Sequence, residues 1–451
     1  LELNLERFSS ENLIDLTGMF YGCSSLESVY IGDSVTSIPN YAFKNCTKLK
    51  NVTLGKSIST IGISAFENCS ALENITLPDS IYIINEKAFA DCYRLNEIII
   101  PNNTWVIDKN AFYYCNSLKN VVIGNSVMYI DDYAFDYCTA IETLKIGSSV
   151  ERIGNSAFNA CESIKSVELP KKLRFIDTYA FSYCNSLEEV VIPDAVTTMK
   201  ENAFSNCDKL KKVTIGKGVT EIPSAAFNMC PSLTDITIKG EVTTIGDSAF
   251  ANCTSLESIT LPDSVSTMLS SVFYNDESLK NFNFPTSLTE IQAYLFAGCD
   301  SLTEVTIPDT ITAISSYAFN GCDKLEKVTI GDSVSSIGYC TFESCPSLKE
   351  VKIGSSVKKI NQYAFFNCEA LESIEIPDSV DYLASYVFKD CTSLKSVKLG
   401  NKIPCIYYGT FTNCKSLESI EIPGNISFIE GEAFLNCESL KSVDIKPGIK
   451  N

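Results

Sequence analysis

The sequence predicts an α/β repeat protein: a curved solenoid with a parallel β-sheet on one face and short helical turns and short extended segments on the other. Cysteine stands at residue 23 and at every 23rd residue to 437, with one lapse at Asp276. Phenylalanine stands three residues before each of these nineteen positions, from Phe20 to Phe434. Aliphatic residues recur in the same register. Self-similarity at a fixed period of this length is typical of solenoids.

The first element of each repeat is a strand. Counted from the cysteine as position 0, positions +6 and +8 are aliphatic, as in Val213 and Ile215. Positions +5 and +7 are mostly polar, and this alternation is the period of a half-buried strand. Proline or glycine at +9, often followed by aspartate and serine, ends the strand in a turn. Positions +5 and +7 are therefore predicted to face away from the core.

The rest of the repeat returns the chain to the next strand. Aliphatic residues near +12 and +15 predict a second, short extended segment. The stretch YAFKNCTKL, residues 41–49, then spaces alanine, phenylalanine, cysteine and leucine at intervals of one, three and three. This spacing suits one helical turn that points inward. Repeats stacked in register would place equal positions side by side, so the alternating charges Lys352, Glu375, Lys398 and Glu421 are predicted to pair.

The cysteine column is predicted to be a packing feature. It lies between two apolar columns, and cysteine behaves as a small buried hydrophobe. Equivalent cysteines one coil apart would lie about 5 Å apart, beyond the roughly 3.5–4.5 Å between Cβ atoms that a disulfide needs. The chain has no C-x-x-C pair and no histidine, so the usual zinc spacings are absent. We therefore expect the 18 in-register cysteines to be reduced and buried, and we expect no metal or cofactor.

Composition argues against several classes of function. Without histidine, triads and metal sites that depend on it are excluded, and no phosphate-binding loop or nucleophile-elbow motif occurs. The net charge of −19 argues against nucleic acid and anionic lipid as partners. The aspartates that follow the strand, such as Asp33 and Asp309, suit turns better than calcium ligation. No apolar run reaches the roughly 18 residues of a membrane span, so we expect no membrane insertion by this chain.

The repeat consensus, A-F-x-x-C-x-x-L-x-x-V-x-I-[PG]-x-x-V-x-x-I, resembles the BspA-like leucine-rich repeats of the Treponema-type 23-residue class. The resemblance implies a leucine-rich-repeat solenoid. Members of this family are mostly cell-surface or secreted proteins implicated in adhesion. It therefore implies an extracellular, non-enzymatic module that binds a protein or glycan at a cell surface. A rigid stalk that projects another domain remains the alternative, and the oligomeric state stays open.

Two parts of the array depart from the consensus. Residues 1–22, with GMFYGC as their most telling part, resemble a partial repeat of a related longer type, and residues 23–451 form the continuous array. An irregular coil is predicted near 264–298. There Asp276 replaces the cysteine, and Phe282 and Phe284 replace the strand aliphatics, so we expect distortion and a hydrogen-bonded or hydrated carboxylate.

Candidate binding residues are the apolar and aromatic exceptions on an otherwise polar exterior. They gather between about residues 99 and 191, and contiguous exposed patches of this kind often mark interaction sites. An alternative is that the tyrosines only cover the seams between coils. The candidates are Ile99, Val122 and Val191 on the strand, and Tyr113, Tyr114, Tyr133, Tyr137, Tyr179 and Tyr183 on the turn.

Overall fold

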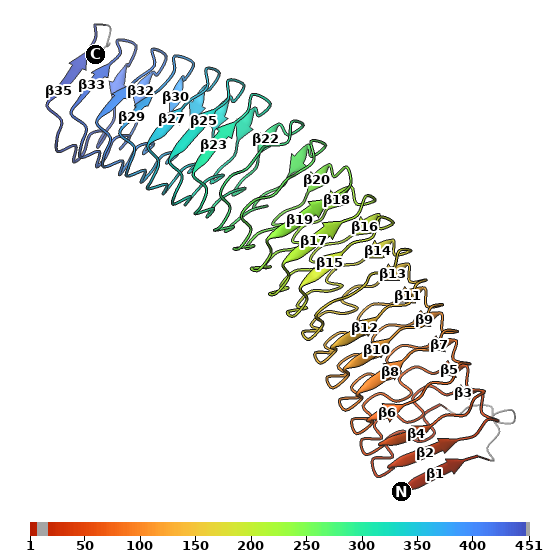
Figure 1. Cartoon of the computed structure of the whole chain (residues 1–451). Helices are drawn as coiled ribbons and strands as arrows, with labels where there is room; N and C mark the ends of the chain where they lie inside the picture. Colours follow the sequence, from red (N-terminus) through yellow and green to blue (C-terminus); the bar gives the residue numbers. More distant parts are fainter. Residues whose placement is uncertain (7–16, 448–451) are drawn as a thin grey trace. The chain divides into compact units, whose positions relative to one another are not determined.

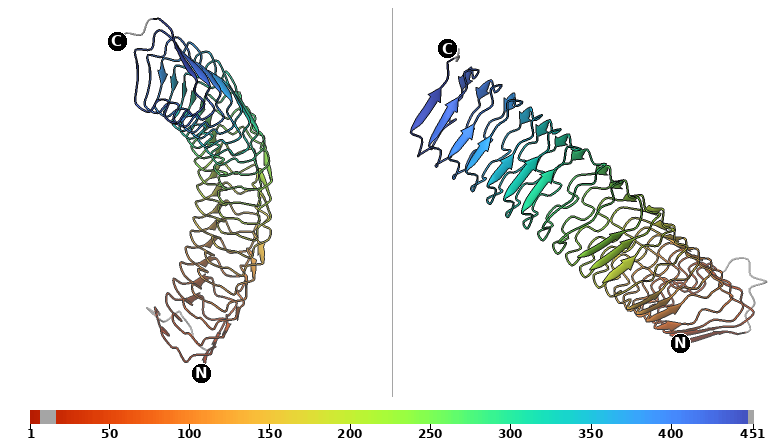
Figure 2. Two further views of the ribbon diagram at one scale, coloured as in Figure 1. Left: turned by 90° about the vertical axis from the view of Figure 1, so that its left-hand side faces the viewer. Right: turned by 45° about the horizontal axis from the view of Figure 1, so that its top comes forward.

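A computed structural model describes residues 1–6 and 17–447 of the chain. They divide into two units, Leu1–Gly240 and Glu241–Asn451. Within each unit, successive coils lie side by side, and most coils pass through a main strand of two to four residues and a second strand of two residues (Figures 1 and 2). The main strands stack on one side of the coils and the second strands on another, which confirms the predicted parallel solenoid.

The first unit contains two rows of strands. Its main strands are β1 (Glu2–Leu5), β2 (Ser28–Ile31), β4 (Asn51–Thr53), β6 (Asn74–Ile75), β8 (Glu97–Ile99), β10 (Asn120–Val122), β12 (Thr143–Lys145), β15 (Glu189–Val191), β17 (Lys212–Ile215) and β19 (Asp235–Ile238). Its second strands are β3 (Ser37–Ile38), β5 (Thr60–Ile61), β7 (Ile83–Ile84), β9 (Val106–Ile107), β11 (Tyr129–Ile130), β13 (Arg152–Ile153), β14 (Phe175–Ile176), β16 (Thr198–Met199) and β18 (Glu221–Ile222).

The second unit repeats this arrangement. Its main strands are β23 (Glu304–Ile307), β25 (Lys327–Ile330), β27 (Glu350–Lys352), β29 (Ser373–Glu375), β31 (Ser396–Lys398), β33 (Ser419–Ile422) and β35 (Ser442–Ile445). Its second strands are β20 (Thr244–Ile245), β21 (Thr267–Met268), β22 (Glu290–Ile291), β24 (Ala313–Ile314), β26 (Ser336–Ile337), β28 (Lys359–Ile360), β30 (Tyr382–Leu383), β32 (Cys405–Ile406) and β34 (Phe428–Ile429).

The strand register follows the sequence period. Ser28 of β2 pairs with Asn51 of β4, 23 residues on, and all ladders within each unit are parallel. β1 pairs with β2 through Glu2 and Ser28, an offset of 26 residues (28 minus 2). Much of the predicted longer repeat at residues 1–22 lies outside the described residues, so that boundary stays a prediction. Glycine at +9 permits close coil contact at Gly216, where an added Cβ would lie 2.5 Å from the backbone of Pro193.

The predicted helical turn is wrong: no helix occurs among residues 1–6 and 17–447. Two residues in each coil, at positions −5 and −1, have φ between +51° and +74°, as Tyr41 and Asn45 do. Such a left-handed residue in every fourth place cannot continue a right-handed helix. The backbone N–H groups of these turns instead donate alternately to the next coil and to their own coil. Phe43 donates to Ala65 of the next coil at 2.8 Å, whereas Cys46 donates to Phe43 of its own coil at 3.1 Å. Apolar spacing of one, three and three fits these consecutive turns as well as it fits a helix.

The core consists of stacked columns. The phenylalanine rings lie parallel, with centroids 5.3 Å apart for Phe66 and Phe89. The cysteines are free, and most are buried, although Cys23 is exposed and Cys437 is half-buried at the ends of the array. The prediction of free, buried thiols is therefore confirmed for the in-register cysteines other than these two.

Most in-register thiols also have a hydrogen-bond partner that the sequence did not reveal. The Cys69 thiol donates to the Phe43 carbonyl of the preceding coil at 3.1 Å, and this contact recurs along the column. The cysteine thus fills space and satisfies a backbone carbonyl in the core, where an unpaired polar group would be costly.

The coil near 264–298 departs from this pattern on its strand side. Residues 257–262 and 280–285 form no strand, and Phe282 packs edge-to-face against Phe296 at 4.8 Å. Asp276 is fully buried, and its carboxylate accepts the Cys253 N–H at 2.8 Å, so the predicted hydrogen bond is confirmed. Its other carboxylate oxygen has no hydrogen-bond partner among the described residues. Burial raises the pKa of Asp276 well above the ordinary value.

Candidate interaction surfaces

The strand-face patch, defined as Ile99, Val122 and Val191, lies on main strands as predicted. Ile99 and Val191 are 55% and 46% exposed, and Val122 is half-buried. Ile99 pairs directly with Val122 between β8 and β10. Val191 is not their neighbour, because Val122 pairs onward with Lys145 and Val191 pairs with Thr214. The structure therefore joins two members of the patch and separates the third.

A groove of about 800 Å³ lies between the two parts of the strand-face patch. Main-strand pairing lapses after β12, where only Ser166 bridges to Glu189 of β15. The walls carry charged side chains, among them Lys145, Glu168 and Lys171. This region thus offers aliphatic side chains beside a groove lined by both charge signs.

The turn-side tyrosines, defined as Tyr113, Tyr114, Tyr133, Tyr137, Tyr179 and Tyr183, also lie on the surface. Tyr113 and Tyr114 are half-buried, and the other four are between 38% and 48% exposed. Tyr114 stacks on Tyr137 of the next coil with centroids 4.7 Å apart, and Tyr113 meets Tyr114 edge-to-face. The structure gathers these three into one aromatic cluster.

Tyrosine is a costly choice at these turns. All of this set except Tyr113 occupy left-handed positions, which asparagine and glycine adopt more easily. Asparagine holds position −1 in eight coils. There the Asn68 amide donates to Asn45 of the preceding coil at 2.9 Å. A surface tyrosine at position −1, as at Tyr114, Tyr137 and Tyr183, therefore does not follow from the needs of the fold.

The buried thiols do not form a reactive site. Burial raises the pKa of Cys184 to about 12 and that of Cys46 to about 11, so the nucleophilic thiolate is disfavoured. Within the described residues, no group of three or more cysteine, aspartate or glutamate side chains could hold a metal ion. The aspartates after the strand accept backbone N–H groups of the next coil, as Asp309 does from Asp332 at 2.7 Å. Their predicted role in turns is confirmed.

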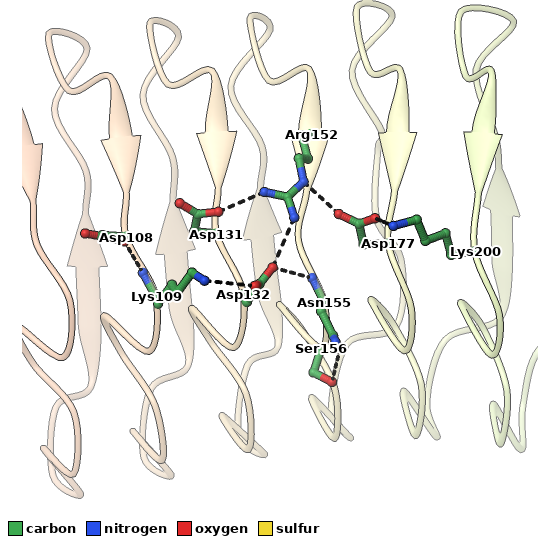
Figure 3. A network of polar contacts seen from close by, with 9 residues as sticks. All are labelled: Asp108, Lys109, Asp131, Asp132, Arg152, Asn155, Ser156, Asp177 and Lys200. Carbon is green, nitrogen blue, oxygen red and sulfur yellow. Dashed lines mark hydrogen bonds and ion pairs between the residues drawn. The ribbon is translucent and has the colours of Figure 1, made fainter.

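The charged cluster around Arg152 is held together by its own contacts (Figure 3). Arg152 lies on β13, and its guanidinium contacts three carboxylates: Asp131 at 2.9 Å, Asp132 at 3.1 Å and Asp177 at 2.7 Å. Lys200 pairs with Asp177 at 3.0 Å, and Lys109 pairs with Asp132 at 3.4 Å. We call these residues the Arg152 network.

Burial matters most at one end of the Arg152 network. The side chain of Asp177 is only 8% exposed, so its ion pairs with Arg152 and Lys200 are needed to offset the cost of burying a carboxylate. Burial raises the pKa of Asp131, and the nearby Arg152 opposes that rise. The acids that could attract a cation thus already face cationic side chains. The network ties successive coils together, and we interpret it as structural.

A second aromatic row was missed by the sequence analysis. It runs along six successive coils of the second unit, with neighbouring ring centroids 4.7–5.8 Å apart. The signal in the sequence was tyrosine recurring at or beside position −5. Its members are Tyr294, Tyr317, Tyr339, Tyr363, Tyr386 and Tyr408.

Comparison with known proteins agrees with this architecture. The profile of the family described as BspA type leucine rich repeat region (6 copies) matches residues 17–142, 106–234, 220–349 and 335–451. A leucine-rich repeat protein from Bacteroides ovatus is 26% identical, with a TM-score of 0.63 over 77% of this chain and 86% of its own. None of the described residues forms a helix with the length and hydropathy of a membrane span.

Further matches are more distant in structure. A leucine rich cell surface protein from Faecalibacterium prausnitzii is 26% identical over 78% of this chain and 82% of its own, with a TM-score of 0.36. A leucine-rich repeat protein from Eubacterium ventriosum is 28% identical over 53% of this chain and 74% of its own, with a TM-score of 0.38. The search of curated proteins found no match.

Proposed function

Because the chain belongs to the BspA-type leucine-rich-repeat family, we propose that it is a non-enzymatic, cell-surface or secreted module that binds a partner protein or glycan. One observation carries the proposal. Aliphatic and aromatic side chains are exposed at positions where other coils place polar residues. Exposed apolar groups that add nothing to the core are typical of interaction surfaces.

We place the main contact region between residues 99 and 191. Ile99 and Val122 supply adjoining aliphatic surface, and the Tyr114–Tyr137 stack supplies aromatic surface with polar tips. Such side chains offer large contact area with little loss of conformational entropy. Both groups sit on rigid coils whose cores are complete without them, so a ligand would meet a preorganised surface.

The test is binding of the labelled chain to cells and to arrays of surface proteins and glycans. Val122→Lys and Val191→Lys should abolish binding and leave the melting temperature within about 2 °C, because neither side chain is in the core. Thr53→Lys is the matched control, since it places the same charge at the same repeat position outside the region.

The turn-side tyrosines allow a second arm. Tyr114→Asn and Tyr137→Asn introduce the residue that eight other coils carry at this position, so the fold should tolerate them. Binding should weaken while stability is kept or raised. If all of these variants bind as the parent does, the stalk alternative replaces the binding proposal.

A further inference from the structure

A groove on the second-strand side of the second unit differs in chemistry from the charged groove of the first unit. It has a volume of about 510 Å³ and runs beside β24, β26, β28 and β30. None of the described residues that line it is charged. Its polar and aromatic lining residues include Ser315, Ser336, Tyr339, Asn361, Gln362 and Tyr382.

Tyr339 reaches this groove through a one-residue shift in the tyrosine row. Tyr317 and Tyr363 occupy the left-handed position −5 of their coils, whereas Cys340 takes that position in the coil between them, with φ of 52°. Cys340 is buried, and Tyr339 precedes it by one residue. The off-register cysteine therefore places the tyrosine at position −6.

The shift turns the Tyr339 ring out of the stack. Tyr294 and Tyr317 lie parallel at 4.7 Å and 4°, and Tyr363 and Tyr386 at 5.0 Å and 1°. Tyr339 stands at 69° to Tyr317 and at 86° to Tyr363. The rings of the two parallel pairs cover one another, whereas the Tyr339 ring stands across the row and lines the groove.

This groove suits a ligand that combines apolar faces with many hydroxyl groups. Tyr339 and Tyr382 supply aromatic bodies with polar tips. Serine hydroxyls and the Gln362 amide can both donate and accept hydrogen bonds. Lys359 lies between Ser336 and Tyr382 in the strand register but does not line the groove, so the lining itself offers an ionic ligand no counter-charge. A wholly apolar ligand would leave the amides and hydroxyls unpaired.

We propose that the groove is a subsite for an uncharged oligosaccharide, whose C–H faces pack on Tyr339 and Tyr382 while its hydroxyls bond the serine and amide groups. The proposal names a ligand class for the binding function proposed above and rests on that function. It is independent of the contact region between residues 99 and 191.

The experiment titrates the full chain with neutral oligosaccharides from an array that also holds sialylated and sulfated ones. Each substitution introduces a residue type that another coil already carries at the same repeat position. Tyr339→Ser follows Ser316, at position −6 one coil earlier, and Tyr382→Thr follows Thr267, at position −9. Each should reduce affinity for the bound neutral oligosaccharide roughly tenfold or more, with only a small fall in melting temperature from the lost ring contacts to neighbouring tyrosines. Tyr294→Asn, in the same tyrosine row but outside the groove, is the matched control and should bind as the parent does.

The outcomes separate the two proposals. Absence of neutral oligosaccharide binding, preference for sialylated or sulfated oligosaccharides, or unchanged affinity in both variants overturns the subsite. The subsite is also overturned if a peptide or protein ligand displaces the bound oligosaccharide and no other oligosaccharide does. If cell binding still depends on Val122, the proposed function survives that failure. If the chain binds neither cells nor any arrayed protein or glycan, both proposals fail.

Discussion

The Arg152 network and the uncharged groove occupy the same repeat positions in different coils. Position −7 is Asp131 or Asp177 in the first region and Ser315 or Asn361 in the second. The turn backbone is alike in both, with left-handed residues at −5 and −1. In the first region the side chains neutralise one another across coils, whereas in the second they leave an open, uncharged hollow.

The inward columns and the turn backbone therefore specify the fold, while these surface positions are free to vary. A surface position is structural where its side chain forms ion pairs with a neighbouring coil. It is available to a ligand where its side chain forms none.

Arg152→Met should be the most damaging surface change. It leaves Asp177, with its side chain 8% exposed, dependent on Lys200 alone. It also removes the guanidinium from Asp131 and Asp132, of which Asp132 keeps Lys109. We expect a loss of about 1–3 kcal/mol, less than for a fully buried pair because Arg152 is partly screened by solvent. Urea unfolding measures the loss. Arg174→Met is the control because Arg174 is exposed, and an equal effect from both variants would contradict a structural role for the network.

Asp276 differs from the acids of the Arg152 network, because it is a buried carboxylate without a cation among the contacts described. Asp276→Cys restores the column residue and the thiol donor, and should stabilise the chain by roughly 1–3 kcal/mol at pH 7. The control Asp323→Asn removes an exposed charge instead and should change little. Thermal melts of the two variants beside the parent decide this, and a destabilised Asp276→Cys variant would count against the account.

The gain from Asp276→Cys should depend on pH. The folded chain holds the Asp276 proton more tightly than the unfolded chain, since burial raises the folded-state pKa. The parent's stability from this group is therefore greatest at low pH, and falls as the pH rises from about 3.9 toward the raised value. The variant should show its larger advantage at pH 7 and a smaller one at pH 4. An advantage that is the same at both values would refute the buried-acid interpretation.

The exposed charge ladder should show the smallest effect. Lys398 pairs with Glu375 on the main-strand face, and the hydrogen bond and charge of Glu375 raise the pKa of Lys398. Glu375→Lys sets three lysines in a row, so melting should fall slightly at low salt, and the fall should vanish at high salt. Glu97→Lys, on β8 of the first unit, is a comparison outside this run. A salt-independent fall at residue 375 would mean that the change acts through packing instead.

Much of the fold could be predicted because a strict period carries both register and orientation. The exposed Ile99 and the buried Val213 follow from alternation alone. The turn between Ala42 and Cys46 was mistaken for a helix, since apolar spacing is the same in both structures. Its signal was the residue before the cysteine, which is asparagine, glycine or aspartate in most coils, the types that tolerate positive φ.

The candidate surfaces were harder to predict, because their grouping depends on neighbours in space. Val191 shares a repeat position with Val122 but lies beyond a charged groove. The orientation of the Tyr339 ring depends on two features together: a cysteine out of register and a tyrosine row on both sides. A single sequence reveals each irregularity, but it does not reveal that Cys340 turns an adjacent ring out of a stack.

The most direct test measures stability and neutral-oligosaccharide binding in Arg152→Met and Tyr339→Ser in parallel. We expect opposite losses: the first variant loses stability and binds as the parent does, and the second loses much less stability but roughly tenfold in affinity. A Tyr339→Ser variant that loses as much stability as Arg152→Met, or an Arg152→Met variant that loses binding while staying fully stable, would contradict the division between structural and ligand-facing positions.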